Sequence, residues 1–173
     1  MPQARAATLV GTPGAVSGII GLAVDRVSYD VTFMFGSYEE VYVAPGTTPT
    51  FLDNQPNAEL AANLIIELFN AEEVPSTVDT DADIVTGEVS HFFIPYHTFS
   101  SSISVVAATN TAPAGTAAAW NMDRSVADTT TNTMFAVFTP TAVPVPTALP
   151  LFASGLGVIG LLGWRRKRKK AAA

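Results

Sequence analysis

The stretch Gly18–Phe35, GIIGLAVDRVSYDVTFMF, carries the clearest secondary-structure pattern in the chain. From residue 27 onward, aromatic and β-branched residues alternate with Ser, Asp, Thr and Met, a period of two that is typical of a half-buried β-strand. The alternating residues are Val27, Tyr29, Val31, Phe33 and Phe35. We expect Ile19–Val24 to pair with this strand through a tight turn at Asp25-Arg26. The turn residues are poor for that purpose, because two-residue hairpins favour Asn-Gly or Asp-Gly.

The segment Asn57–Asn70, NAELAANLIIELFN, predicts one amphipathic helix. Asn57 is a suitable N-cap, Glu59 suits the first turn and Asn70 suits the C-terminal end. A leucine recurs every fourth residue, with apolar neighbours beside each, which predicts a stripe facing the core. The stripe comprises Leu60, Leu64 and Leu68, flanked by Ala61, Ile65 and Phe69. This helix is expected to cover one face of a sheet.

Short apolar runs after the helix predict further strands, separated by loops rich in Thr, Ala and Gly. They are His91–Tyr96, Ser102–Ala108, Ala119–Met122 and Phe135–Phe138. The segments Thr109–Thr116 and Thr129–Thr133 are expected to be loops or edge strands. The prediction is an α+β domain over residues 17–138, a mostly antiparallel sheet with one amphipathic helix packed on it. Because the chain has no cysteine, this domain must rest on its apolar core.

Charge divides the chain into two parts. It holds 9 Lys+Arg and 15 Asp+Glu, for a net charge of −6. Residues 1–147 contain all 15 acids but only three of the cations, Arg5, Arg26 and Arg124, and so carry −12. Phosphate backbones would repel such a body, which argues against a nucleic-acid partner. The split indicates two parts in different surroundings.

The other six basic residues stand together near the C-terminus, after an apolar segment. They are Arg165, Arg166, Lys167, Arg168, Lys169 and Lys170. The segment Ala148–Trp164 has no ionisable side chain, and its length as a helix, about 25 Å, approaches that needed to cross the hydrocarbon core. A transmembrane helix over 148–164 with a cytoplasmic basic tail over 165–173 is predicted. The alternative is a buried core helix with a solvated tail, but that helix would lack a polar face.

Between domain and membrane, residues 139–147 form a Pro/Thr linker that contains Val143-Pro144-Val145-Pro146. Proline fixes φ and lacks an N–H, so this linker is expected to be extended and open to a protease.

The order of proline motif, apolar helix and basic cluster resembles a PEP-CTERM sorting signal. The resemblance implies cleavage near the proline motif by an exosortase, a membrane protease of Gram-negative bacteria that make exopolysaccharide. It also implies release of the domain or its transfer to the cell surface. The family motif is usually Val-Pro-Glu-Pro, and Val145 stands here in place of the glutamate. Sortase signals share the layout, but Leu149–Ala153 lacks the Thr and Gly of Leu-Pro-x-Thr-Gly.

The hairpin stretch carries a second resemblance, to a domain recurrent among PEP-CTERM proteins that opens with a pattern of the kind GLxVxGxxYDVTF. The matching residues are Gly21, Leu22, Val24, Tyr29, Asp30, Val31, Thr32 and Phe33. Arg26 stands where the pattern has glycine, so a looser hairpin is expected at that point.

Export of the domain requires an N-terminal signal. MPQARAATLV has one basic residue and lacks the apolar core of a signal peptide, but Ala4-Arg5-Ala6 is an A-x-A cleavage pattern. Our hypothesis is that the true start lies upstream and that residues 1–16 begin with the remnant of a signal peptide.

Two groups of residues are candidate metal sites. Alternate carboxylates at Asp79, Asp81 and Asp83 can gather around Ca²⁺, but the spacing fails the EF-hand pattern, so a solvated acidic loop is favoured. His91 and His97 flank Phe92–Tyr96, where Pro95 breaks the strand geometry, and two histidines without a third ligand give a weak zinc signal. No cofactor is predicted, with Ca²⁺ as the alternative.

The sequence contains no cysteine nucleophile, Gly-x-Ser-x-Gly elbow, P-loop or dinucleotide fingerprint. A non-enzymatic, exported surface or matrix protein is therefore predicted, first held in the inner membrane and then sorted by an exosortase-like protease. Exopolysaccharide or other matrix proteins are its candidate partners. The alternative is a permanently anchored envelope protein whose exported domain binds a ligand or Ca²⁺. A secreted hydrolase is the third hypothesis.

Overall fold

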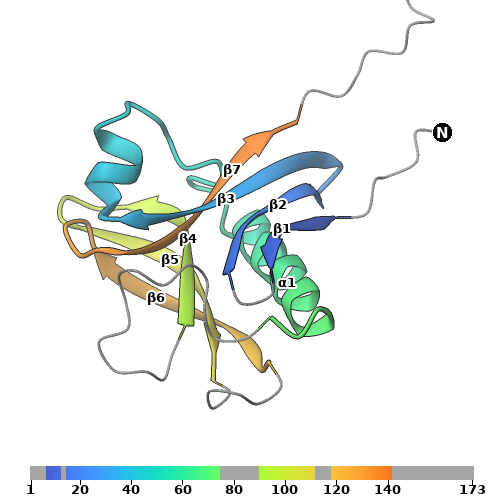
Figure 1. Cartoon of the computed structure of the whole chain (residues 1–173). Helices are drawn as coiled ribbons and strands as arrows, with labels where there is room; N and C mark the ends of the chain where they lie inside the picture. Colours follow the sequence, from blue (N-terminus) through green and yellow to red (C-terminus); the bar gives the residue numbers. More distant parts are fainter. Residues whose placement is uncertain (1–6, 13–14, 75–89, 112–117, 142–173) are drawn as a thin grey trace, which may run out of the picture. The chain divides into compact units, whose positions relative to one another are not determined.

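The structure, a computed structural model, describes residues 7–12, 15–74, 90–111 and 118–141 (Figure 1). These residues form a seven-stranded sheet, one α-helix and a short π-helical turn, η1. In chain order the elements are β1 (Thr8–Thr12), β2 (Ala15–Val24), β3 (Val27–Gly36), η1 (Glu39–Val43), α1 (Gln55–Ala71), β4 (Ser90–Thr98), β5 (Ser102–Asn110), β6 (Trp120–Asp128) and β7 (Thr133–Pro140). The predicted α+β class with a mostly antiparallel sheet is confirmed. The sheet also includes Thr8–Thr12, although the domain was predicted to begin at residue 17.

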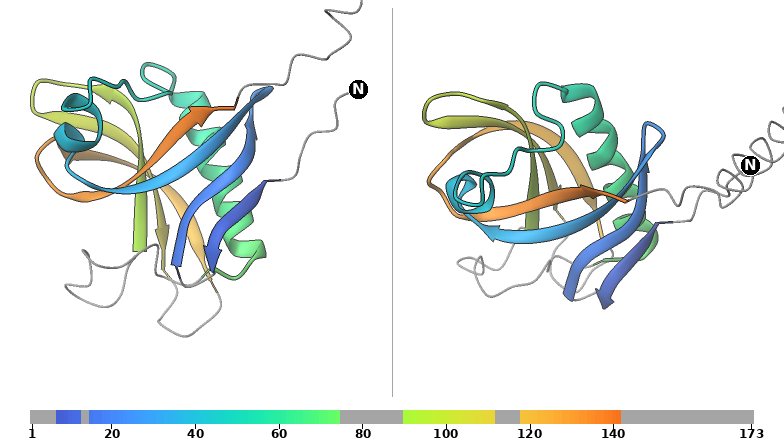
Figure 2. Two further views of the ribbon diagram at one scale, coloured as in Figure 1. Left: turned by 45° about the horizontal axis from the view of Figure 1, so that its top comes forward. Right: turned by 90° about the horizontal axis from the view of Figure 1, so that it is seen from above.

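The strands follow the order β1-β2-β3-β7-β4-β5-β6. Neighbouring strands are antiparallel except β4 and β7, which are parallel and joined at a single pair, Phe93 and Phe135. Helix α1 contacts β2 near one edge of the sheet and β4, β5 and β6 toward the other. The sheet therefore curls around α1, as the two views of Figure 2 show.

The predicted hairpin is confirmed, and its turn is as short as a hairpin turn can be. Val24 pairs with Val27, and Asp25 and Arg26 alone form the turn, with φ of 42° and 71°. Positive φ at both positions is the type I′ pattern that matches the twist of the flanking strands. The looser hairpin expected from Arg26 is thus wrong: the strand register holds both residues in the left-handed region.

A β-bulge interrupts β2 at Gly21, the first residue that matches the GLxVxGxxYDVTF pattern. The pairing of β2 with β3 shifts between Ile19 and Leu22, and Gly21 there has φ of 77°. The Gly21 backbone N–H, turned out of the regular ladder, donates to Oδ1 of Asp30 on β3 at 3.0 Å. Gly21 and Asp30 therefore form one structural unit, since the glycine permits the bulge and the carboxylate satisfies its free donor.

Helix α1 begins earlier than predicted. Asn54, not Asn57, is the N-cap, and its side-chain Oδ1 accepts a hydrogen bond from the Asn57 backbone N–H at 3.3 Å. Pro56 falls in the first turn, where its missing N–H costs no hydrogen bond.

The buried face of α1 confirms only part of the predicted stripe: Ala61, Ile65 and Phe69 are buried, but the leucines are not fully buried. Leu60 is 40 % exposed, and Leu64 and Leu68 are only partly buried. The fully packed face is Ala58, Ala61, Ala62, Ile65, Ile66 and Phe69. Alanines let the helix backbone lie close to the curled sheet, and the leucines cover its flank.

The main core lies between α1 and the sheet. Phe69 is at its centre, with ring centroids 5.7 Å from Phe33, 5.9 Å from Phe92 and 5.0 Å from Trp120. Trp120 is also fixed by polar contacts: its indole N–H donates to the Val74 carbonyl at 2.9 Å, and its backbone N–H donates to Asn70 Oδ1 at 2.9 Å. Asn70 therefore docks edge strand β6 onto the end of the helix.

A second, smaller core lies on the other face of the sheet, under η1. It consists of Tyr38, Val41, Tyr42, Ile103, Val105 and Phe135. A reciprocal pair of hydrogen bonds starts η1: the Ser37 N–H donates to Glu40 Oε2 at 2.9 Å, and the Glu40 N–H donates to Ser37 Oγ at 3.2 Å. This is the capping-box arrangement, which satisfies two N–H groups at the start of the turn.

Candidate functional site

Most of the predicted site residues lie outside the described part of the chain. This holds for the sorting motif Val143, Pro144, Val145 and Pro146, for the basic cluster Arg165–Lys170 and for the carboxylates Asp79, Asp81 and Asp83. The predicted helix over 148–164 lies there too. Among the described residues, no helix is both long and apolar enough to span a membrane.

The two predicted histidines lie on opposite faces of β4. His91 pairs with Thr109, but the register shifts after Pro95, so His97 pairs with Ser104 and Tyr96 becomes the extra residue. Residues 109 and 104 of β5 point to opposite faces because side chains alternate along a strand. The bulge at the proline, which the sequence indicated, therefore separates the two rings.

Each histidine has its own polar partner. His97 Nδ1 lies 2.8 Å from Asp53 Oδ1 on the surface, and His91 Nε2 lies 2.9 Å from Thr133 Oγ1. The described residues contain no group of three or more His, Cys, Asp or Glu side chains placed to hold a metal ion.

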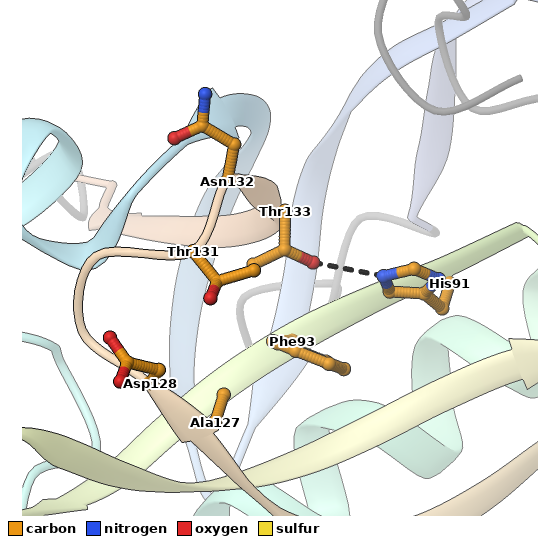
Figure 3. Close-up of a pocket in the computed structure, with 7 residues that line it drawn as sticks. All are labelled: His91, Phe93, Ala127, Asp128, Thr131, Asn132 and Thr133. Atoms are coloured by element: carbon orange, nitrogen blue, oxygen red, sulfur yellow. Dashed lines mark hydrogen bonds between the residues drawn. The ribbon is translucent and has the colours of Figure 1, made fainter. Parts of the chain in front are cut away.

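His91 belongs to an open cleft of about 340 Å³ (Figure 3). The cleft is lined by His91 and Phe93 of β4, Ala127 and Asp128 of β6, Thr131 and Asn132 of the β6–β7 connection, and Thr133 of β7. We call it the β6–β7 cleft. It borders the second core, because Phe93 and Ala127 pack against that core.

The topology of the sheet creates this cleft. Strands β6 and β7 are consecutive in the chain, but β5 and β4 lie between them in the sheet, so the connection over residues 129–132 must cross both strands. Backbone hydrogen bonds hold it in place: the Thr129 N–H donates to the Ser101 carbonyl at 3.2 Å, and the Glu39 N–H donates to the Thr129 carbonyl at 3.4 Å. The connection thus lies beside the β4–β5 hairpin, as Figure 1 shows.

Asp128 is the carboxylate of the cleft, and its position is fixed locally. Its Oδ1 accepts from the Thr130 backbone N–H at 2.8 Å and from the Thr130 hydroxyl at 2.6 Å. These hydrogen bonds hold the pKa of the Asp128 carboxyl below its usual value, with the side-chain bond the larger cause. Asp128 is therefore an ionised acceptor at neutral pH.

The apolar part of the cleft is Phe93. Its ring centroid lies 5.1 Å from the His91 ring and 6.3 Å from Phe135. Figure 3 shows Phe93 and Ala127 at the base of the cleft, the Thr131 hydroxyl above them, and the Asn132 side chain turned away from the other residues.

The contact between His91 and Thr133 resembles a hydroxyl nucleophile beside its general base. Thr133, however, is only 4 % exposed, so its hydroxyl has little access to a carbonyl or glycosidic carbon in the cleft. The contact fits a positioning role better than covalent catalysis. In that role the His91 ring and the Thr133 hydroxyl orient each other.

Sequence reasoning identified only His91 of these residues. The run Thr129–Thr133, TTTNT, was predicted as a loop or an edge strand; residues 129–132 form the β6–β7 connection, and Thr133 begins β7. A sequence signal for the cleft did exist, since a carboxylate followed by consecutive hydroxyl residues is typical of a turn closed by side-chain hydrogen bonds. It gave no indication that β4 lies beneath that turn.

The chain has no match among the protein-family models, and neither the search of curated proteins nor that of solved structures gives one.

Proposed function

We propose that this chain is an exported surface or matrix protein with a C-terminal sorting signal of the PEP-CTERM type, cleaved by an exosortase-like membrane protease. The observation that carries the proposal is the sequence order of Val143–Pro146, the apolar segment 148–164 and six adjacent cations. The apolar segment serves as a transmembrane helix before processing, and the basic cluster remains on the cytoplasmic side.

The way in which the folded domain ends supports this proposal. Strand β7 ends at Pro140, and Thr141 is tied to β3, since its N–H and its hydroxyl donate to the Ser28 carbonyl at 2.8 and 2.9 Å. All seven strands of the described sheet thus precede the proposed cleavage site. Cleavage within Val143–Pro146 would remove no hydrogen bond or core residue of that sheet.

The described domain also suits a role that needs no chemistry of its own. The threonine that contacts His91 in its cleft is buried, and the fixed polar groups of the cleft suit binding. The second candidate is an envelope protein that stays anchored and binds a ligand in this cleft. Uncleaved chain in the membrane would favour this second candidate.

A processing assay tests the proposal. The chain is expressed behind a functional signal peptide in a host with an exosortase, with one tag directly after the signal peptide and another after Lys170. The first position leaves β7, Thr133–Pro140, intact. We expect the first tag to leave the membrane without the second, and the intact mass of the released form to end near Val143–Pro146.

Matched variants show whether the motif directs the cleavage. Val145→Glu restores the usual family motif and should increase the released fraction. Pro144→Ala with Pro146→Ala should abolish release while the chain remains in the membrane. If both tags stay together in the membrane for the parent chain and for Val145→Glu, the segment is an anchor and the sorting proposal is wrong.

A further inference from the structure

We infer that the β6–β7 cleft binds one or two rings of a neutral saccharide. A saccharide would be the partner of the exported domain, and this part of the inference rests on the proposed function. The binding itself requires only the described sheet and connection.

The composition of the cleft matches the two sides of a sugar ring. A pyranose has a face of C–H groups and a rim of hydroxyls, so it is bound by an aromatic ring together with fixed hydrogen-bonding groups. The cleft provides the Phe93 ring and Ala127 as an apolar base, with the Asp128 carboxylate and the Thr131 hydroxyl beside them (Figure 3). A volume of about 340 Å³ is at the small end of ligand pockets, which suits one or two rings.

The polar groups are held in position before any ligand arrives. Two hydrogen bonds from Thr130 occupy Oδ1 of Asp128 and orient Oδ2, the second acceptor of the carboxylate. The connection is fixed to Ser101 and Glu39, and the hydroxyl of Thr133 is held by His91. Such preorganisation reduces the ordering cost of binding a small ligand.

Charge favours a neutral ligand over an anionic one. Asp128 is the single carboxylate among the lining residues, and residues 1–147 carry −12, so phosphates and uronic acids would be repelled. A divalent cation such as Ca²⁺ prefers six to eight oxygen ligands with several carboxylates, and one carboxylate provides too few. Neutral hydroxyl groups, which donate to a carboxylate without bringing charge, match its free acceptor oxygen.

The test uses the full chain, purified in a polyoxyethylene detergent, because glycoside detergents would themselves present sugars. Neutral trisaccharides of glucose, galactose and mannose are compared with a galacturonate trimer and with CaCl₂. Binding is followed by saturation-transfer NMR and by titration calorimetry. We expect saturable binding of at least one neutral trisaccharide with Kd below about 10 mM, and transfer from aromatic protons to the C–H protons of the sugar.

Variants assign the binding to the cleft. Phe93→Ala and Asp128→Asn should each weaken binding about tenfold, the effect of losing roughly 1.4 kcal/mol of contact. The matched controls are Phe99→Ala, an aromatic residue 54 % exposed outside the cleft, and Asp123→Asn, an exposed carboxylate on the same strand. These controls should keep the parent affinity within about twofold, by the same relation. Unchanged melting temperature of Asp128→Asn shows that the loss is not unfolding.

Three results would overturn the inference: no binding of any neutral trisaccharide, tighter binding of the galacturonate trimer or Ca²⁺, or equal losses in cleft and control variants. The assay uses unprocessed chain, so it is independent of sorting. If the chain is cleaved but binds no sugar, the proposed function stands and this inference is wrong. If it binds sugar but is not cleaved, only the sorting proposal is wrong.

Discussion

The face of the sheet under α1 and the face under η1 bury different kinds of surface. On the α1 face, Phe33, Phe69, Phe92 and Trp120 form a continuous aromatic core closed by a seventeen-residue helix. On the other face, a five-residue turn covers a smaller core. The β6–β7 cleft opens beside that smaller core. The comparison teaches that the two faces are packed differently, one closed by a long helix and the other left partly open beside a short turn.

Truncation of one aromatic residue on each face gives the largest expected contrast. Phe69→Ala removes the ring at the centre of the main core and should lower the free energy of unfolding by about 3–5 kcal/mol. Phe93→Ala removes a partly buried ring at the base of the cleft and should cost about 1 kcal/mol. Urea unfolding followed by tryptophan fluorescence measures both. Similar losses for the two variants would contradict the division between a packed face and an open one.

A substitution at Gly18 of β2 tests how closely β2 and β3 approach each other. A Cβ added at Gly18 would lie 2.4 Å from the Val31 carbonyl oxygen, a backbone atom that cannot rotate away. Gly18→Ala should therefore destabilise the domain by about 1–3 kcal/mol.

Gly46→Ala is the control for Gly18→Ala, because its Cβ would meet nothing within 4 Å although its φ is +70°. It should cost about 1 kcal/mol, from backbone strain alone. If Gly46→Ala costs as much as Gly18→Ala, collision with Val31 is not the cause.

Because a tyrosine is buried in the second core, the free energy of unfolding should fall at alkaline pH. Burial raises the pKa of Tyr42 above its ordinary value of 10.0, and Tyr38 raises it further. Below pH 10 both folded and unfolded states keep the proton, so stability is unaffected. Above pH 10 the unfolded state loses the proton first, and the free energy of unfolding should fall by about 1.4 kcal/mol per pH unit.

Urea midpoints from pH 8 to pH 11.5 measure this alkaline loss. No lysine precedes Lys167, so lysine titration in the domain does not obscure the effect. Tyr42→Phe should make the loss of stability above pH 10 less steep. An equal slope in parent and variant would show that Tyr42 is as well solvated as an exposed tyrosine.

The hydrogen bond at the β2 bulge should have a smaller effect on stability. Asp30→Ala removes the acceptor of the Gly21 N–H and should lower the free energy of unfolding by about 1–2 kcal/mol, since the donor loses a charge-assisted partner. Asp30→Asn keeps an oxygen in place and should cost about half as much. Asparagine has nearly the volume of aspartate, so equal losses in the two variants would show that the carboxylate charge, and not an oxygen acceptor alone, stabilises the bulge. No loss in Asp30→Ala would show that this hydrogen bond does not stabilise the domain.

The sequence predicted local structure better than structure that depends on long-range contacts. The β2–β3 hairpin was predictable because alternation and turn position lie within eighteen neighbouring residues. The core-facing side of helix α1 was predicted in part, since the flanking residues Ala61, Ile65 and Phe69 are buried. The leucines that repeat every fourth residue looked like the centre of the stripe, but they lie at its side. The curled sheet instead requires small residues where the helix approaches it most closely.

The cleft could not be predicted, because it depends on strand order. Asp128 and Phe93 are far apart in the chain and share a cleft only because the β6–β7 connection crosses β5 and β4. The separation of His91 from His97 was partly predictable, since Pro95 marks a break in the ladder, but the face that each histidine occupies follows from the register with β5. The sorting motif is a local pattern of a different kind, and it stays a prediction.

The smallest expected effect is a gain in stability at the hairpin turn. Asp25 and Arg26 have positive φ, which costs about 1 kcal/mol for a residue with a Cβ and little for glycine. Arg26→Gly combined with Asp25→Asn gives the turn that type I′ hairpins favour. Part of the gain is offset because glycine is freer in the unfolded chain, so we expect a net increase of about 0.5–1 kcal/mol in the free energy of unfolding. Asp25→Asn alone should give less than half of it. A loss of stability in the double variant would mean that a contact of Arg26 stabilises the fold by more than its positive φ costs.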